Sequence, residues 1–467
     1  MNGLAVLITT AVTLAALSLL FTKGRVRNTE EYVLARNSLG PGAMSFSLFA
    51  TGMGVWILFG PAEALLTAGV FALFSYALAS TFSLWIFAWI GTRIRQVLPA
   101  GTTLTEYVLT RFGTPMYLLV LAVTFVYMAI AIAAGLSGMG LAGEIMYGIP
   151  PWQTIAILGF ATLFYTALGG FRASVVAGKL QTFVILPLFA LLVAMSVFLM
   201  GDFGAAWTQA NVPPLGWPDI DYGLALLIGV ICAEAFDQIW WQHVYSGRDE
   251  RAMRRGFFIT GLMVFPVVLI AGAIGVYAAA GGATFSPSTA IFDFLVNMPA
   301  WLSTSAMVLA VALVMGNTDS LLNGMVSLAT VDVRRLVPSL ADEKLLLLAK
   351  LLTVLFALTA MAIATLGFSV LYLFLLADLI CAGAAFPVFY GMFSKSVGKR
   401  AALVAAVLGI ASGALLFPDP SFTRGDLGLS FLVALIVPAV IMLVFRKKST
   451  EPHTVVGSDP ADSSARQ

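Results

Sequence analysis

The sequence predicts an all-α polytopic membrane protein with thirteen transmembrane helices. Of its 467 residues, 60% are hydrophobic and only 10% are charged, whereas a soluble domain has about 45–50% apolar and about 25% charged residues. The chain divides into thirteen long apolar runs, and a spanning helix needs about 20 such residues. When these runs are threaded as alternating spans, 24 of the 25 Lys and Arg residues fall on one side of the membrane.

This composition disfavours a water-soluble enzyme, a nucleic-acid-binding protein and a secreted disulfide scaffold. The net charge of +2 does not indicate a polyanionic partner. Cys232 and Cys381 lie inside apolar runs, as expected for buried small hydrophobic residues. One of the 2 histidines, His453, lies in a polar tail. The sequence therefore predicts no enzymatic activity and no bound cofactor.

The spans follow one another with short connections. No basic residue precedes the first run, as one would precede the apolar core of a signal peptide, so we predict a retained helix there. The expected spans are 3–20, 42–65, 67–90, 117–146, 152–168, 175–200, 222–241, 257–280, 303–330, 345–366, 370–393, 401–416 and 427–445.

The asymmetry of the basic residues predicts the orientation. Among Lys and Arg, Arg424 alone falls on the outer side, so the positive-inside rule places the N-terminus outside and the C-terminus in the cytoplasm. We expect an integral protein of the cell membrane, plasma or inner. One membrane domain should cover 1–446, followed by a disordered cytoplasmic tail at 447–467 that is rich in Ser, Asp and Pro.

The second span is interrupted by helix-breaking residues. It contains Thr51, Gly52, Gly54, Gly60 and Pro61. Dense glycine allows either close helix packing or local unwinding, and the proline together with the polar threonine favours a discontinuous helix. Such a break is tolerated in a membrane only where protein covers it or where it lines a cavity.

An aromatic residue lies within this interrupted span. Trp56 is a candidate lid or cation-π face for a bound solute. Packing against lipid or the protein core is an equally good interpretation.

The seventh span carries ionisable and amide side chains. Glu234 and Asp237 share one helix face, and Gln238, Gln242 and His243 follow. Either these groups line an interior path, or the stretch from Asp237 onward is a helix end that reaches cytoplasmic water. Glu234 lies about one turn deeper and favours the interior position.

The ninth span contains the densest polar cluster. A single carboxylate there could be explained by helix–helix hydrogen bonding, but this many polar groups indicate a binding site or an ion path. They are Gly316, Asn317, Thr318, Asp319, Ser320 and Asn323.

Three further acidic residues lie in or beside apolar runs. Asp378, in the eleventh span, is a weaker candidate because a lone carboxylate can pair with a nearby basic residue. Glu63 and Glu144 lie at predicted outer ends of spans and are expected to be solvated.

The two interrupted helices are five spans apart. That spacing predicts two five-helix repeats, 42–200 and 222–393, each beginning with a discontinuous helix. The extra N-terminal helix at 1–22 and the two C-terminal helices within 401–446 would then be peripheral.

Several segments resemble the sodium:solute symporter family. The segment 31–40 reads EYVLARNSLG and resembles the family's EY-LAGR-LG pattern. The segment 165–181 resembles its Y---GG--A------Q signature, and 319–332 resembles its S-DS-LN-----------D helix. The segment 237–242 is also faintly similar to the urea-type active transporters of this superfamily.

The resemblance implies a LeuT-like five-plus-five inverted repeat and a sodium site between the two repeats. Motif alignment puts its backbone ligands at Ala50 and Met53 and its helix positions at Leu313, Gly316 and Asn317. The last two replace the family's usual pair of hydroxyl residues.

The altered positions leave the coupling ion open. Sodium prefers oxygen ligands, which Asn317, Thr318 or Asp319 could supply in place of the missing hydroxyls. Proton coupling through Asp319 or Glu234 is the alternative.

The function implied by the resemblance is ion-coupled symport of a small polar solute such as an amino acid, urea or a carboxylate. The alternatives are an uncoupled facilitator or channel and a transporter-derived membrane sensor. The expected partners are the solute, the coupling ion and the lipid bilayer. The residues expected to contact the solute or couple its movement are Thr51, Gly52, Trp56, Glu234, Asp237, Gln238, Thr318 and Asp319.

Overall fold

The computed structural model describes residues 3–22, 36–99, 101, 103–281, 286–337, 339–394, 396–420 and 424–446. Every regular element in these ranges is a helix. The elements are α1 (Gly3–Thr22), α3 (Pro41–Gly52), η1 (Val55–Leu58), α4 (Gly60–Thr67), α5 (Val70–Val97), α6 (Leu104–Phe112), α7 (Thr114–Tyr147), α8 (Pro151–Met200), α9 (Phe203–Ala210), α10 (Trp217–Glu234), α11 (Gln238–Ser246), α12 (Glu250–Ala280), α13 (Ala290–Val296), α14 (Ala300–Leu336), α15 (Asp342–Ala364), α16 (Val370–Phe393), α17 (Lys399–Leu416) and α18 (Leu427–Val444). The predicted tail and the first half of the 31–40 motif lie outside the described residues.

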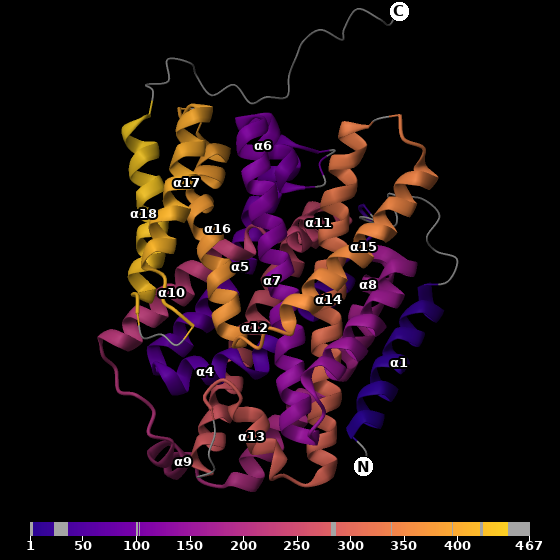
Figure 1. Cartoon of the computed structure of the whole chain (residues 1–467), viewed down its shortest axis with the longest axis vertical. Coiled ribbons are helices and arrows are strands. Elements are labelled where there is room, and N and C mark those ends of the chain that lie inside the picture. Colours follow the sequence, from indigo (N-terminus) through magenta and orange to yellow (C-terminus); the bar gives the residue numbers. More distant parts are fainter. Residues whose placement is uncertain are drawn as a thin grey trace, which may run out of the picture.

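The prediction of thirteen spans is confirmed. Within the described ranges, 11 helices are long and apolar enough to cross a membrane, and two bent helix pairs raise the number to 13. The long helices run along one axis of the molecule, and α1 begins at the end opposite the one where α18 finishes (Figure 1). The chain is an integral membrane protein.

Glycine and proline set the limits of these helices. Pro115 lies in the first turn of α7, where a missing N–H costs nothing. The helix stops at Gly148, which adopts a left-handed conformation with φ 64°. Pro150 and Pro151 then begin α8. The apolar runs therefore end and restart as separate helices at the glycine and proline residues between them.

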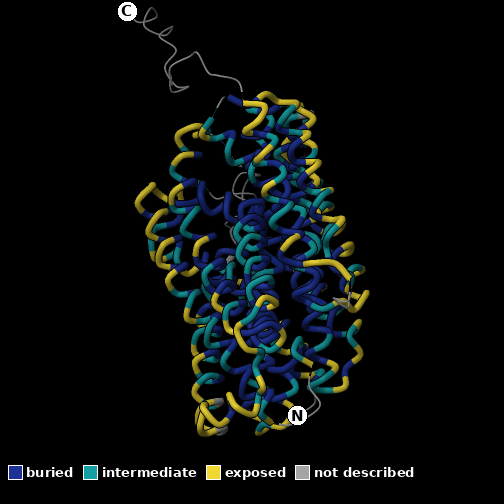
Figure 2. The backbone as a smooth tube through the Cα atoms, turned by 90° about the vertical axis from the view of Figure 1, so that its left-hand side faces the viewer, coloured by how far each residue is buried: buried dark blue, intermediate teal, exposed yellow. Residues whose placement is uncertain are grey.

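The buried residues lie along the axis of the bundle (Figure 2), and many large apolar side chains are exposed on its outer surface. Phe183, Phe198 and Leu415 are 71%, 79% and 86% exposed. Large apolar side chains at that exposure would be unstable in water, but they suit the hydrocarbon of a bilayer.

The expected loop between the fifth and sixth spans is replaced by a kink. The two spans are joined as α8, whose only non-helical residue is Gly170, with φ 55° and ψ −154°. The short helices α6, α9 and α13 lie in connections between the predicted spans, where no regular structure was expected.

The expectation for the two outer glutamates is only half right. Glu144 is exposed as expected. Glu63 is 8% exposed and therefore buried, because it begins α4 inside the broken second span rather than ending a helix at the membrane surface.

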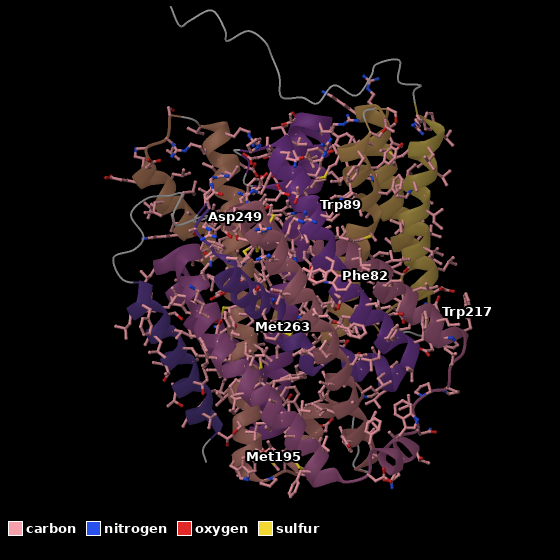
Figure 3. The ribbon with its side chains drawn as sticks, turned by 180° about the vertical axis from the view of Figure 1, so that it is seen from behind. Phe82, Trp89, Met195, Trp217, Asp249 and Met263 are labelled. Carbon is pink, nitrogen blue, oxygen red and sulfur yellow. The ribbon has the colours of Figure 1, made fainter. Side chains whose placement is uncertain are left out.

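Asp249 lies at the start of α12, in the upper half of the molecule as drawn in Figure 3, whereas Met195, near the end of α8, lies close to the lower end. Asp249 caps α12 by accepting from Ala252 N–H at 2.7 Å. That backbone hydrogen bond holds the pKa of the Asp249 carboxyl below its usual range.

We expect Gly170→Ala to destabilise the protein by about 1–3 kcal/mol, because a side chain is strained at this positive φ. Thermal unfolding in detergent would measure the change. Gly398→Ala is the matched control, since Gly398 has φ −76° and nothing within 4 Å of an added Cβ. Equal melting temperatures for the two variants would contradict the prediction.

Candidate solute and ion site

The second span breaks at Met53 and Gly54, between α3 and η1. The segments on either side are bent by 56°. At Gly54 an added Cβ would lie 2.7 Å from Trp56 Cδ1 and 3.1 Å from Asn317 Cγ, so only glycine permits this approach. The predicted discontinuous helix is confirmed.

The break exposes backbone carbonyls that a continuous helix would use. Side chains satisfy two of them. Asn317 Nδ2 donates to the Thr51 carbonyl at 3.0 Å, and Trp56 Nε1 donates to the Gly52 carbonyl at 3.2 Å. The first of these bonds ties the broken helix to α14.

The seventh span breaks between α10 and α11, with a bend of 52°. Asp237 starts α11 by accepting from Ile239 N–H at 2.9 Å. Trp240 Nε1 donates to the Glu234 carboxylate, and Trp241 Nε1 donates to the Ala235 carbonyl at 3.0 Å. The Trp241 indole thus satisfies a backbone carbonyl at the break, and the Trp240 indole satisfies the side chain of Glu234.

The water-exposed interpretation of the segment after Asp237 is wrong. Asp237, Gln238, Gln242 and His243 are all at most 5% exposed. His243 Nε2 lies 3.0 Å from Ser47 Oγ on α3. The two broken spans are therefore in direct contact, and an added Cβ at Gly52 would lie 3.3 Å from the Trp240 ring.

A small cavity lies beside both breaks. Its volume is about 40 Å³, enough for a small polar group. Two carboxylates line it, those of Glu234 and Asp378, and no Lys, Arg or His does. Its other walls are Trp56, Tyr76, Ser80, Tyr127, Leu226, Val230, Ala233, Leu371 and Phe374. The Trp56 and Tyr76 rings lie 5.3 Å apart, centroid to centroid, so the cavity is acidic and aromatic.

A larger groove of about 520 Å³ lies at the start of α12, away from both breaks. Arg251, Arg254 and Arg255 line it together with Glu250 and apolar side chains. Its position on the outer surface separates it from the polar interior.

A second polar cluster surrounds Asp319 on α14. Its carboxylate accepts from Tyr165 Oη at 2.5 Å and from Ser174 Oγ at 2.8 Å, both on α8. Ser320 Oγ lies 3.2 Å from Ser174 Oγ and 3.3 Å from Thr51 Oγ1. This cluster, which we call the Asp319 cluster, therefore joins α3, α8 and α14.

The candidate residues divide into three groups. Trp56 and Glu234 line the cavity, whereas Thr51 and Asp319 belong to the Asp319 cluster. Asp237 and Gln238 begin α11 and do not line the cavity. Five residues occupy the positions aligned with the family's sodium ligands. Ala50 lies on α3 and Met53 directly after its end, whereas Leu313, Gly316 and Asn317 lie on α14, the helix that carries Asp319.

The sequence analysis gave too little weight to Asp378 and did not identify Tyr165 and Ser174 as partners of Asp319. Asp378 faces the cavity and not a basic residue. The sequence does show Asp378 as a lone carboxylate in an apolar span, and such a residue commonly marks a functional site. The contacts of Tyr165 and Ser174 with Asp319 join residues about 150 positions apart in the chain, and no local pattern indicates them.

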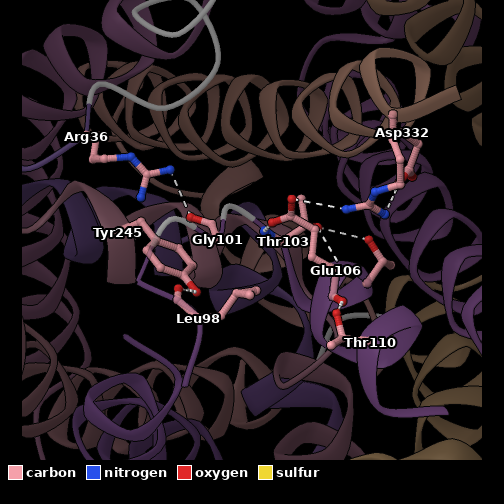
Figure 4. A network of polar contacts seen from close by, with 10 residues as sticks. Arg36, Leu98, Gly101, Thr103, Glu106, Thr110, Tyr245 and Asp332 are labelled. Atoms are coloured by element: carbon pink, nitrogen blue, oxygen red, sulfur yellow. Dashed lines mark hydrogen bonds and ion pairs between the residues drawn. The ribbon is translucent and has the colours of Figure 1, made fainter. Parts of the chain in front are cut away.

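A polar network ties segments together at the α6 end of the bundle (Figure 4). Arg36 Nη2 donates to the Gly101 carbonyl at 2.9 Å, and its guanidinium lies 5.4 Å from the Tyr245 ring centroid. Tyr245 Oη donates to the Leu98 carbonyl at 3.0 Å. An ion pair of 3.1 Å joins Glu106 to Arg335. These contacts tie the segments just before α3 and just after α5 to each other and to α11, and they join α6 to α14.

Two broken spans that meet around buried carboxylates define a secondary membrane transporter. The family model confirms this class. The chain belongs to the sodium:solute symporter family, whose model matches residues 32–409.

Individual relatives share the fold across most of the chain. The spermidine transporter DUR31 of Candida albicans is 25% identical over 382 residues, which are 80% of this chain and 71% of that protein. A Na⁺-coupled sialic acid symporter, solved in a substrate-bound outward-open state, is 18% identical, with 95% of this chain and 97% of that chain covered and a TM-score of 0.79. The manganese transporter of Eremococcus coleocola is 13% identical, with coverages of 88% and 99% and a TM-score of 0.53. The two structures establish the predicted five-plus-five fold.

Because Asp237 caps α11, we expect Asp237→Ala to cost about 1 kcal/mol of stability. Asp237→Asn should keep most of it, since an asparagine oxygen also accepts from Ile239 N–H. Thermal unfolding would compare the two variants, and solute uptake would test binding. A large rise in KM for Asp237→Asn without loss of stability would instead make Asp237 a binding residue.

Proposed function

We propose that this protein is a sodium-coupled symporter that imports a small organic amine cation. The observation that carries the proposal is the cavity between the broken spans, where Glu234 and Asp378 face aromatic rings without a basic side chain. Carboxylates pair with ammonium groups, and aromatic faces attract cations. A solute carboxylate would instead meet two groups of its own sign. The solute class is thus narrower than the small polar solutes that the sequence suggests.

One relative supports the same solute class. The spermidine transporter of Candida albicans carries a polyamine by its name, and a polyamine presents primary ammonium groups. The cavity of about 40 Å³ has room for one such group. The remainder of a longer amine would require the cavity to open towards one membrane face.

The proposal includes the direction of transport. The positive-inside rule puts the end of the bundle that carries Arg36, Arg111 and Arg335 in the cytoplasm. The polar network at that end, which includes the Arg36–Gly101 hydrogen bond and the Glu106–Arg335 ion pair, would then be the cytoplasmic gate. The N-terminus would lie outside and the C-terminus inside.

The coupling prediction is that purified protein in liposomes accumulates radiolabelled spermidine above equilibrium when an inward sodium gradient is imposed. Replacing external sodium by choline should reduce uptake to equilibration. We expect Asp319→Asn to lose accumulation, because the amide removes the charge that accepts from Tyr165 and Ser174.

Exposed Glu343→Gln, on α15, is the control for this loss of charge. Uptake is also measured with an imposed proton gradient in the absence of sodium. Accumulation under that condition would indicate proton coupling in place of sodium coupling. If the solute only equilibrates across the membrane, and neither the sodium gradient nor the proton gradient changes this, an uncoupled facilitator is favoured over a symporter.

The solute prediction concerns the cavity carboxylates. We expect Glu234→Gln and Asp378→Asn each to raise the KM for the amine by roughly 10–100-fold, since a buried hydrogen bond to a charged group contributes about 1.5–3 kcal/mol. Initial uptake rates at saturating sodium would measure this. Glu144→Gln, which alters an exposed carboxylate, should leave KM unchanged. Uptake of urea with the same affinity in all three variants would contradict an amine substrate.

A further inference from the structure

Two backbone carbonyls at the break of α3 have no hydrogen-bond donor within the described part of the chain. The last carbonyls of the helix are otherwise satisfied, by Met53 N–H on Phe49 and by the side chains on Thr51 and Gly52. The carbonyls of Ala50 and Met53 receive no hydrogen bond, although both residues are 1% exposed. Buried carbonyls without a partner are uncommon. They indicate a ligand that brings its own positive charge.

A third buried oxygen without a partner lies near the Ala50 carbonyl, on the side of α14. Gln181 on α8 is 1% exposed, and neither atom of its side-chain amide makes a hydrogen bond of acceptable geometry among the described residues. The amide lies near the Tyr165 hydroxyl, whose proton is already donated to Asp319.

The Gln181 amide can approach α14 only because residue 316 is glycine. An added Cβ on Gly316 would lie 2.6 Å from Gln181 Oε1 and 3.6 Å from the Ala50 carbonyl oxygen. The side-chain oxygen of Gln181 therefore occupies the space that any residue larger than glycine would fill on this face of α14. The Gln181 amide and the Ala50 carbonyl both border that space.

We infer that Gln181 Oε1 is a ligand of the coupling sodium ion, together with the carbonyls of Ala50 and Met53. The inference rests on the sodium coupling proposed above. Sodium is a hard cation that binds carbonyl and amide oxygens, and a bound cation would satisfy all three unpaired acceptors at once.

Asn317 is anchored to the broken helix, because its Nδ2 donates to the Thr51 carbonyl. Asp319 contributes negative charge from the neighbouring cluster, where Tyr165, Ser174 and Ser320 hold its carboxylate. Gln181 thus replaces a side-chain oxygen that α14 lacks at Gly316.

The test is sodium-dependent thermal stability of the purified protein without solute, since an ion that binds the folded state raises its melting temperature. NaCl would be titrated at constant ionic strength against choline chloride. We expect Gln181→Ala to raise the half-saturating sodium concentration at least about tenfold, as loss of a metal-site partner does elsewhere. Gln181→Glu keeps an oxygen in place and should retain sodium dependence. Gln153→Ala, on the same helix but near its start, is the matched control.

A rescue experiment separates a ligand from a packing residue. Gly316→Ser alone should weaken sodium binding, because its Cβ and Oγ would displace the Gln181 amide. The double variant Gln181→Ala with Gly316→Ser places a hydroxyl in the vacated space and should restore sodium dependence to within a few-fold of the native protein. The double variant Gln181→Ala with Gly316→Ala fills the same space without an oxygen. It should remain impaired if Gln181 is a ligand, and should recover as fully as the serine variant if Gln181 only fills space.

The outcomes distinguish this inference from the proposed function. If neither the melting temperature nor the solute uptake of the native protein depends on sodium, both the proposed function and the ligand assignment are wrong. Sodium-dependent uptake by the native protein with unchanged sodium titration in Gln181→Ala would overturn the ligand assignment alone. Failure of the double variant to recover any sodium dependence, with its fold intact, would also overturn it.

Discussion

The structure depends on how two interrupted helices satisfy their backbone inside a bilayer. Hydrocarbon offers no hydrogen bonds, so each carbonyl or amide freed by a break needs a protein group, water or an ion. At the first break Asn317 and Trp56 supply donors. At the second, Asp237 caps the new helix, and Trp240 and Trp241 donate to the residues just before it. Breaks supported in this way cost little and leave selected oxygens free for ligands.

The polar side chains around these breaks come from different helices and different sequence repeats. Asp319 on α14 is held by hydroxyl groups on α8, and Ser320 lies within reach of Thr51 on α3. Each group alone would be costly at this depth. Together they form a network in which Tyr165, Ser174 and Ser320 donate to the Asp319 carboxylate, which explains why that carboxylate persists among apolar helices.

The sequence was sufficient to predict the thirteen spans and both breaks, because glycine, proline and polar residues interrupt otherwise apolar runs. It could not predict which face of a uniformly apolar helix turns inward. Asp378 therefore received little weight, although it lines the cavity opposite Glu234. The burial of Glu63 was also missed, since its place within a broken span is a property of tertiary structure. The cap at Asp237 was detectable, because aspartate directly before a new helix is a common N-cap.

The position of the first break links the two binding events that a symporter must couple. Trp56, a wall of the acidic cavity, donates to the Gly52 carbonyl, and the adjacent Thr51 carbonyl is held by Asn317 beside Gly316. The unpaired carbonyls of Ala50 and Met53 flank these same residues. A cation bound there would fix the segment 50–56 and with it the position of the Trp56 ring. An ordered ring favours solute binding, and by linkage the solute favours ion binding to the same degree. The coupling therefore needs no long pathway, because the ion ligands and the solute wall belong to one short unwound segment.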